Sequence, residues 1–111
     1  MELRKTEERS KGMLNFTKEQ KEDALLITLE GRLDTTTSPE LEKELKENLD
    51  GVENLILDFE KLEYISSAGL RVLLSAQKVM SRQGEMKLIH VREEVKEIFE
   101  VTGFLDFLTV E

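Results

Sequence analysis

The sequence predicts a single α/β domain, with helices packed on a mixed, mostly parallel sheet of four to five strands in the order ββαβαβαβ. Two observations support this fold class. Short apolar runs typical of strands alternate with amphipathic stretches of helical length, which favours parallel strands joined by crossover connections. The length of 111 residues also suits one domain with one hydrophobic core.

The first twelve residues, MELRKTEERSKG, are polar and show no hydrophobic periodicity. We therefore expect residues 1–12 to form a flexible arm and residues 13–111 to form the domain. Two alternating segments follow, MLNFTKEQ and ALLITLEG, with the charged residues KED between them. Apolar residues at every second position around a short polar turn predict a β-hairpin, whose first strand would be the antiparallel addition to the sheet.

The first helix is predicted to begin at Ser38, a good N-cap residue, with Pro39 in the first helical position and Glu40 in the first turn. Leucines at positions 41, 45 and 49 give this helix a narrow apolar stripe. A buried-type strand, NLILDF, comes next. The segment from Ser67 to Gln83 then has the broadest apolar arc, so we expect it to be the best-buried helix.

The last third of the chain repeats this alternation. MKLIHV (86–91) is typical of a buried strand, REEVKEIFEVTGF of an amphipathic helix, and FLTV (107–110) of a short final strand. The loops that follow parallel strands emerge at one edge of the sheet, where open α/β sheets bind their ligands. We therefore expect three polar groups to share that edge: Asp34 with Thr35–Thr37, Ser66 with Ser67, and Arg92 with Glu93.

Composition excludes several classes of function. The chain has no cysteine and only one histidine, His90, so a disulfide, a thiolate or transition-metal site and a histidine-based hydrolase triad are not expected. No phosphate-binding glycine motif is present, and we expect no cofactor. The net charge of −8 disfavours direct DNA binding and anionic membrane surfaces. The absence of a signal-like segment makes the cytoplasm the expected location.

Two adjacent serines stand where a predicted strand turns into a helix, in the segment LEYISSAGLRVLL. A serine there can simply be an N-cap residue. Asp34 likewise has an ordinary structural interpretation as an Asx-turn residue, and Gly69 one as a site of close approach between helix and sheet. From the residues alone, the chain reads as a compact α/β domain that binds another molecule.

Three segments resemble one known family. YISSAGLRVLL resembles the signature of the bacterial anti-sigma factor antagonists, which are STAS-domain proteins, and GRLDTTTSPELEKEL and EVTGFLDFLTV resemble two further blocks of that family, in the same order. Family members carry Asp-Ser-[Ser/Ala/Thr]-Gly-Leu at this junction, and the serine after the aspartate is the phosphoacceptor. The resemblance puts that serine at Ser67, with Ser66 in place of the usual aspartate and as the second choice of acceptor.

The resemblance implies a regulator rather than an enzyme. Such a protein binds an anti-sigma factor, itself a serine kinase with a histidine-kinase-like ATP fold, and thereby releases a sigma factor. Phosphorylation of Ser67 by that kinase, with the kinase's own ATP, would end the interaction, and a serine phosphatase would restore it. The residues expected to face the partner are Asp34, Thr35, Thr36, Ser66, Ser67, Gly69 and Arg71.

Two alternatives stay open at this stage. The domain could be a STAS scaffold or sensor module that binds another regulatory protein or a small ligand without being phosphorylated. It could also be an enzyme with a Ser-Lys or carboxylate site that none of the motifs above reveals.

Overall fold

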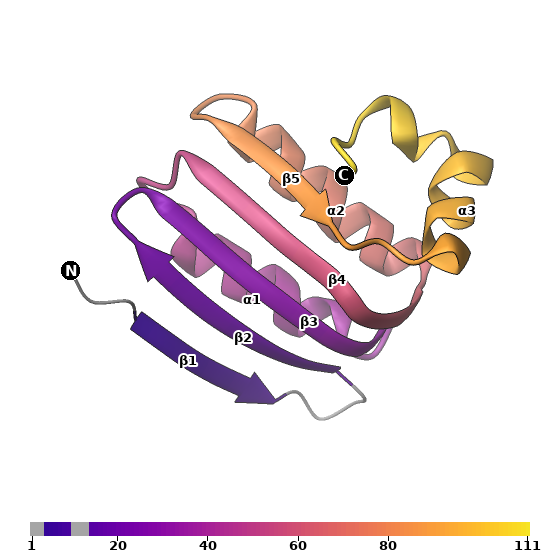
Figure 1. The fold of residues 1–111 in the computed structure, drawn as a ribbon, viewed down its shortest axis with the longest axis horizontal. Coiled ribbons are helices and arrows are strands. Elements are labelled where there is room, and N and C mark those ends of the chain that lie inside the picture. The colour runs from indigo at the N-terminus through magenta and orange to yellow at the C-terminus, as the bar shows by residue number, and fades with distance from the viewer. Residues whose placement is uncertain (1–3, 10–13) are drawn as a thin grey trace.

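The computed structural model describes residues 4–9 and 14–111. In chain order its elements are β1 (Arg4–Arg9), β2 (Leu14–Lys21), β3 (Ala24–Leu33), α1 (Ser38–Asn48), β4 (Asn54–Ile65), α2 (Ser67–Met80), β5 (Glu85–Ile89), α3 (Glu93–Thr102) and the 3₁₀ turn η1 (Phe104–Asp106). The five strands form one sheet in the order β1-β2-β3-β4-β5 (Figure 1). This is the α/β fold with a mixed sheet that the sequence predicts.

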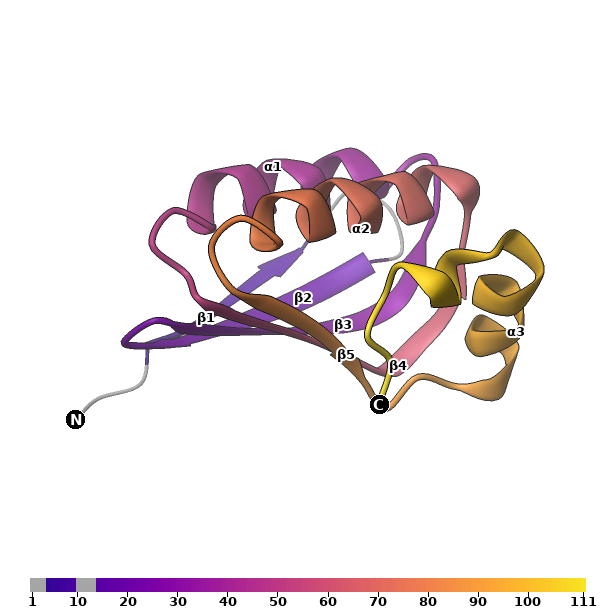
Figure 2. The same cartoon turned by 90° about the horizontal axis from the view of Figure 1, so that it is seen from above.

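The sheet combines an antiparallel and a parallel half. β1, β2 and β3 pair antiparallel, and the hairpin of β2 and β3 confirms the prediction for residues 14–31. β3, β4 and β5 pair parallel, as the alternation of strands and helices indicates. The crossover helices α1 and α2 lie side by side over one face of the sheet, while α3 lies at its end beside β4 and β5 (Figure 2).

Both chain ends differ from the sequence prediction. Residues 4–9 of the predicted arm form β1, and the rest of that arm, together with residue 13 of the predicted domain, lies outside the described residues. β1 is an edge strand joined to β2 through the backbone, so it needs no apolar periodicity. The predicted strand 107–110 is reduced to a single parallel bridge between Leu88 and Val110. The 3₁₀ turn of Phe104–Asp106 precedes this segment, so the chain meets β5 again at Val110.

The hydrophobic core lies between the sheet and helices α1 and α2. Alternate residues of the central strands are fully buried, such as Leu25 and Ile27 in β3 and Leu57 and Phe59 in β4. The leucine stripe of α1 is buried as predicted, and Met80 and Met86 are core residues. Just past the end of β5, Phe99 of α3 packs on Phe59 with 6.4 Å between ring centroids. None of the described helices is long and apolar enough to cross a bilayer.

Candidate functional site

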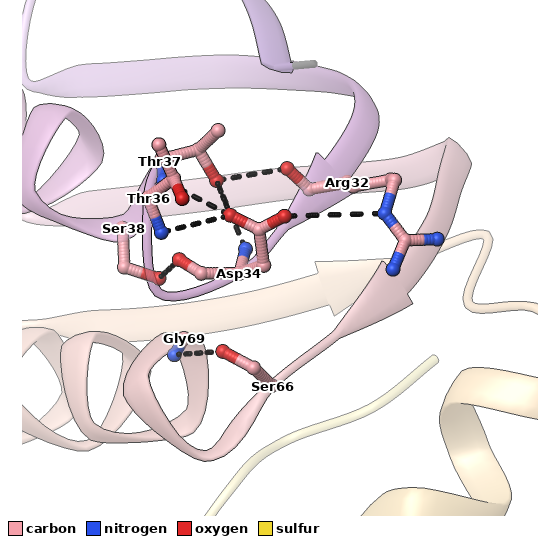
Figure 3. Close-up of polar contacts among 7 residues, drawn as sticks. All are labelled: Arg32, Asp34, Thr36, Thr37, Ser38, Ser66 and Gly69. Carbon is pink, nitrogen blue, oxygen red and sulfur yellow. Dashed lines mark hydrogen bonds and ion pairs between the residues drawn. The ribbon is translucent and has the colours of Figure 1, made fainter. Parts of the chain in front are cut away.

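Strands β3 and β4 run together to their last residues, and this register brings two polar segments side by side. Leu33, the last residue of β3, is opposite Ile65, the last residue of β4. The next residue, Ser66, donates its backbone N–H to the carbonyl oxygen of Leu33 over 2.9 Å. The loop of residues 34–37 and the start of α2 therefore lie next to each other, as the sequence predicts (Figure 3).

Asp34 organises the loop that follows β3. Its Oδ1 accepts hydrogen bonds from the backbone N–H groups of Thr36 and Thr37, at 2.9 and 3.1 Å. Its Oδ2 lies 3.9 Å from Nε of Arg32 (Figure 3). These contacts are those of an Asx turn, so the structural interpretation of Asp34 is confirmed, and its carboxylate stays only partly exposed.

Thr37 holds the same loop from inside. It is fully buried, and its Oγ1 accepts from the backbone N–H of Asp34 and donates to the carbonyl of Arg32, both at 2.9 Å. The predicted N-cap of α1 is wrong by one residue: Thr37 is the N-cap and the helix begins at Ser38. The reason is that Ser38 directs both its N–H and its hydroxyl to the Asp34 carbonyl. Thr35 and Thr36 are exposed.

The two serines of the signature have different environments. Ser66 is the N-cap of α2: its backbone is extended, and its Oγ accepts from the backbone N–H of Gly69 over 3.3 Å (Figure 3). Ser67 is the first residue of the helix and is exposed. Its hydroxyl forms no hydrogen bond with any described residue. Ser66 therefore caps the helix, and Ser67 leaves its hydroxyl free.

Gly69 holds the first turn of α2 close to the sheet. It is buried, and a Cβ at this position would lie 2.8 Å from Cγ1 of Ile65 and 2.9 Å from Cγ of Leu33. Real Cβ contacts are not this short, so only glycine fits without a shift of its neighbours. Close packing thus accounts for Gly69, which is not exposed for the partner contact that the resemblance suggests.

Arg71 lies one turn after Ser67 on α2. It is exposed, and its guanidinium forms no hydrogen bond or ion pair within the described part of the chain. Together with Thr35, Glu42, Ala68 and Lys78 it lines a shallow groove between α1 and α2. An uncompensated cation therefore lies beside the free hydroxyl of Ser67.

Arg92 and Glu93 do not join this group. β5 ends opposite Asp58, whereas β3 ends opposite Ile65, seven residues further along β4. The loop after β5 therefore leaves the sheet roughly 25 Å before the two serines, measured along the strand. Arg92 instead donates its Nε to the carbonyl of Glu60 over 3.0 Å. The prediction of a shared edge holds for two of the three loops.

His90 belongs to a separate charged cluster. It has a left-handed backbone, with φ at 57°, and its Nδ1 lies 3.0 Å from Oδ1 of Asp58 and 3.7 Å from Oε1 of Glu60. Asp58 alternates with the buried Leu57 and Phe59, so this cluster is on the sheet face that α1 and α2 leave uncovered. This grouping of the histidine with two carboxylates was not predicted from the sequence.

The pair of Arg32 and Tyr64 was also missed. The guanidinium carbon of Arg32 lies 4.4 Å from the centroid of the Tyr64 ring, and the same side chain approaches Asp34. Both residues are at the exposed ends of their strands, directly opposite each other in the parallel register. This pair could have been predicted from the sequence. If Leu33 and Ile65 are the paired last residues of two parallel strands, the residues before them, Arg32 and Tyr64, are neighbours too.

Comparisons with known proteins agree with this architecture. Residues 15–111 match the family model of the STAS domain. BtrV of Bordetella bronchiseptica, named as a candidate anti-sigma factor antagonist, is 37% identical over 99 residues, covering 87% of this chain and 85% of that protein.

Two solved structures share the fold. The crystal structure of an anti-sigma factor antagonist from Mycobacterium paratuberculosis has a TM-score of 0.79 at 17% identity, covering 87% of this chain and 84% of that one. The Bacillus cell fate determinant SpoIIAA in its phosphorylated form has a TM-score of 0.68 at 19% identity, covering 86% and 90%. Given the domain match and the identity to BtrV, the chain belongs to the anti-sigma factor antagonist family of STAS-domain proteins.

Proposed function

We propose that this protein binds an anti-sigma factor, thereby releases a sigma factor, and is switched off by phosphorylation of Ser67. The observation that carries the proposal is the free, exposed hydroxyl of Ser67 next to a neighbour that already caps the helix. A kinase can reach this hydroxyl without breaking a hydrogen bond of the described residues. The protein would thus be a substrate and a regulator, and the enzymes would be its partners.

A phosphate at Ser67 is compatible with the fold. The modification adds about −1.5 to −2 charges at pH 7 at the N-terminus of α2, where the helix dipole and unpaired N–H groups favour an anion. A closely packed interface around the same serine would be disrupted, because the dianion would have to lose its water. Phosphorylation should therefore weaken partner binding much more than it changes stability. The phosphorylated form of SpoIIAA shows that a protein of this fold can carry a phosphate.

The partner surface that we propose is made of the residues exposed or half-exposed at this edge. They are Asp34, Thr35, Thr36, Ser66, Ser67 and Arg71. The family resemblance supports a partner that is both anti-sigma factor and serine kinase, and a serine phosphatase that reverses the modification. In the kinase step, the γ-phosphoryl group of ATP would pass to Oγ of Ser67, which loses its proton, and ADP would leave. Such a cycle would operate in the cytoplasm.

The proposal can be tested with purified proteins. The chain is incubated with each candidate anti-sigma kinase of its own organism and with ATP, and intact-mass spectrometry measures the phosphate incorporated. We expect one phosphate on the wild type and on Ser66→Ala, and none on Ser67→Ala. A phosphate that persists in Ser67→Ala and disappears in Ser66→Ala would move the acceptor to Ser66.

A binding experiment complements the mass measurement. Immobilised wild-type protein should retain the anti-sigma factor, and Ser67→Asp should retain much less while keeping its melting temperature. Equal losses of binding and of melting temperature in Ser67→Asp would show that Ser67 has a structural role. Capture of a partner that never phosphorylates the chain would instead support the scaffold or sensor function.

A further inference from the structure

We propose that Arg71 is the intramolecular partner of a phosphate on Ser67. Once the serine is modified, the guanidinium pairs with the phosphate and no longer faces the anti-sigma factor. This inference rests on the proposed function, because it concerns the phosphorylated form. It assigns a role to a cation whose guanidinium has no hydrogen-bond or ion-pair partner among the described residues of the unmodified protein.

The helix geometry brings the two side chains together. Ser67 and Arg71 are both within α2 and both exposed, four residues apart. Residues at this spacing lie on the same helix face with about 5–6 Å between their Cβ atoms. Helical side chains also lean toward the N-terminus, so Arg71 extends over the turn that Ser67 begins. The long arginine side chain can therefore reach a phosphate on Oγ of Ser67 without any change of backbone.

The neighbouring charges leave Arg71 as the available cation. Arg32 is engaged by the ring of Tyr64 and the carboxylate of Asp34. Lys78 lines the same groove, but it lies about 16 Å from Ser67 along the helix axis, beyond the screening length at physiological salt. Glu42 lines the same groove from α1 and would repel a phosphate. Among the described residues, Arg71 thus combines an unpaired charge with a position one turn from Ser67.

This pairing would make the switch a reversal of charge. In the unmodified protein the surface beside Ser67 offers the positive charge of Arg71. After phosphorylation, the same place carries a phosphate of about −1.5 to −2 charges. The planar guanidinium of Arg71 can bind two oxygens of this phosphate at once. A carboxylate of the partner that pairs with Arg71 would lose its cation and face an anion in the same step.

The phosphate itself reports on this contact. Phosphoserine is introduced at position 67 by genetic encoding, which needs no kinase, and ³¹P NMR follows the second pKa of the phosphate in the full chain. The variants are Arg71→Gln and, as the matched control on the same helix face, Lys78→Gln. We expect Lys78→Gln to titrate like the wild type. We expect Arg71→Gln to have a phosphate pKa higher by about 0.3 unit or more, because a nearby guanidinium favours the dianion.

Two outcomes would overturn the proposal. One is an unchanged phosphate pKa in Arg71→Gln, and the other is an equal rise in both variants, which would indicate a general charge effect. Arg71→Lys should fall between wild type and Arg71→Gln, since it keeps the charge but not the planar donor pair. A negative result leaves the kinase assay on Ser67 unaffected, and failure of that assay leaves this titration interpretable, so the two proposals can fail separately.

Discussion

The backbone N–H of Ser66 donates to the carbonyl oxygen of Leu33, with 2.9 Å between the two atoms. This hydrogen bond joins the N-cap of α2 to the strand end from which the 34–37 loop begins. Leu33 also lies beneath Gly69, so the same residue supports the first turn of the helix. The two halves of the proposed partner surface are therefore held in one arrangement before any partner binds.

Gly69→Ala should destabilise the domain. The helix propensity of alanine would by itself stabilise α2 by up to about 1 kcal/mol. The added methyl group meets Ile65 and Leu33 at under 3 Å, and overpacking of this kind costs about 1–3 kcal/mol. Urea unfolding should show a net loss of stability. Ser67→Thr, which adds a methyl group on the exposed side of the same turn, should stay within about 0.5 kcal/mol of the wild type. A stabilised Gly69→Ala would contradict the close approach.

Ser66 and Ser67 should differ when each is replaced by alanine. Ser66→Ala removes the cap and should cost about 0.5–2 kcal/mol, whereas Ser67→Ala should cost less than about 0.5 kcal/mol. Ser66→Asp should retain wild-type stability, since aspartate caps as well as serine and adds a charge that the helix dipole favours. Thermal unfolding of the three variants measures this order. The reverse order of the two alanine variants would assign the cap to Ser67.

Thr37→Val should destabilise the loop more than Thr36→Val. The Thr37 hydroxyl is buried between the N–H of Asp34 and the carbonyl of Arg32, and valine would leave both groups without that partner. Each unsatisfied buried group costs about 1–3 kcal/mol. Thr36 is exposed, so its valine variant is the matched control. Chemical denaturation should separate the two by more than about 1 kcal/mol, and similar values would show that solvent replaces the lost bonds.

Replacements of Asp34 should separate its structural role from a role of its charge. An asparagine side chain would keep an oxygen that can accept from Thr36 and Thr37, so Asp34→Asn should be close to wild type in stability, while Asp34→Ala should lose about 1–2 kcal/mol. Binding to the anti-sigma factor is then measured for Asp34→Asn alone. Unchanged affinity would restrict Asp34 to the turn, and a loss of affinity at unchanged stability would show that the partner recognises its charge.

Much of the fold could be predicted because its periodicities are clear. Alternating apolar residues predicted the β2–β3 hairpin, and leucines at every fourth position predicted the amphipathic helix α1. The structure contains both. β1 could not be predicted, since its residues show no apolar alternation, although its backbone pairs with β2. The final segment was predicted as a strand from its apolar residues, but after Gly103 the chain forms a 3₁₀ turn and rejoins the sheet at one bridge.

The placement of the candidate site residues was predicted in part. The position of Ser67 at a helix start followed from the residues, and the pairing with the 34–37 loop followed from parallel topology. The error over Arg92 and Glu93 came from strand length: parallel strands share a direction, but β5 ends well before β3 and β4. A sequence pattern does not reveal how far one strand extends past its neighbour.

The separation of cap and free hydroxyl between Ser66 and Ser67 has a consequence for how such a protein can change over time. A mutation at position 66 would act on the stability of the folded chain, and one at position 67 would act on the proposed response to a kinase. Selection can therefore adjust durability and responsiveness at two adjacent codons, with little interference between them.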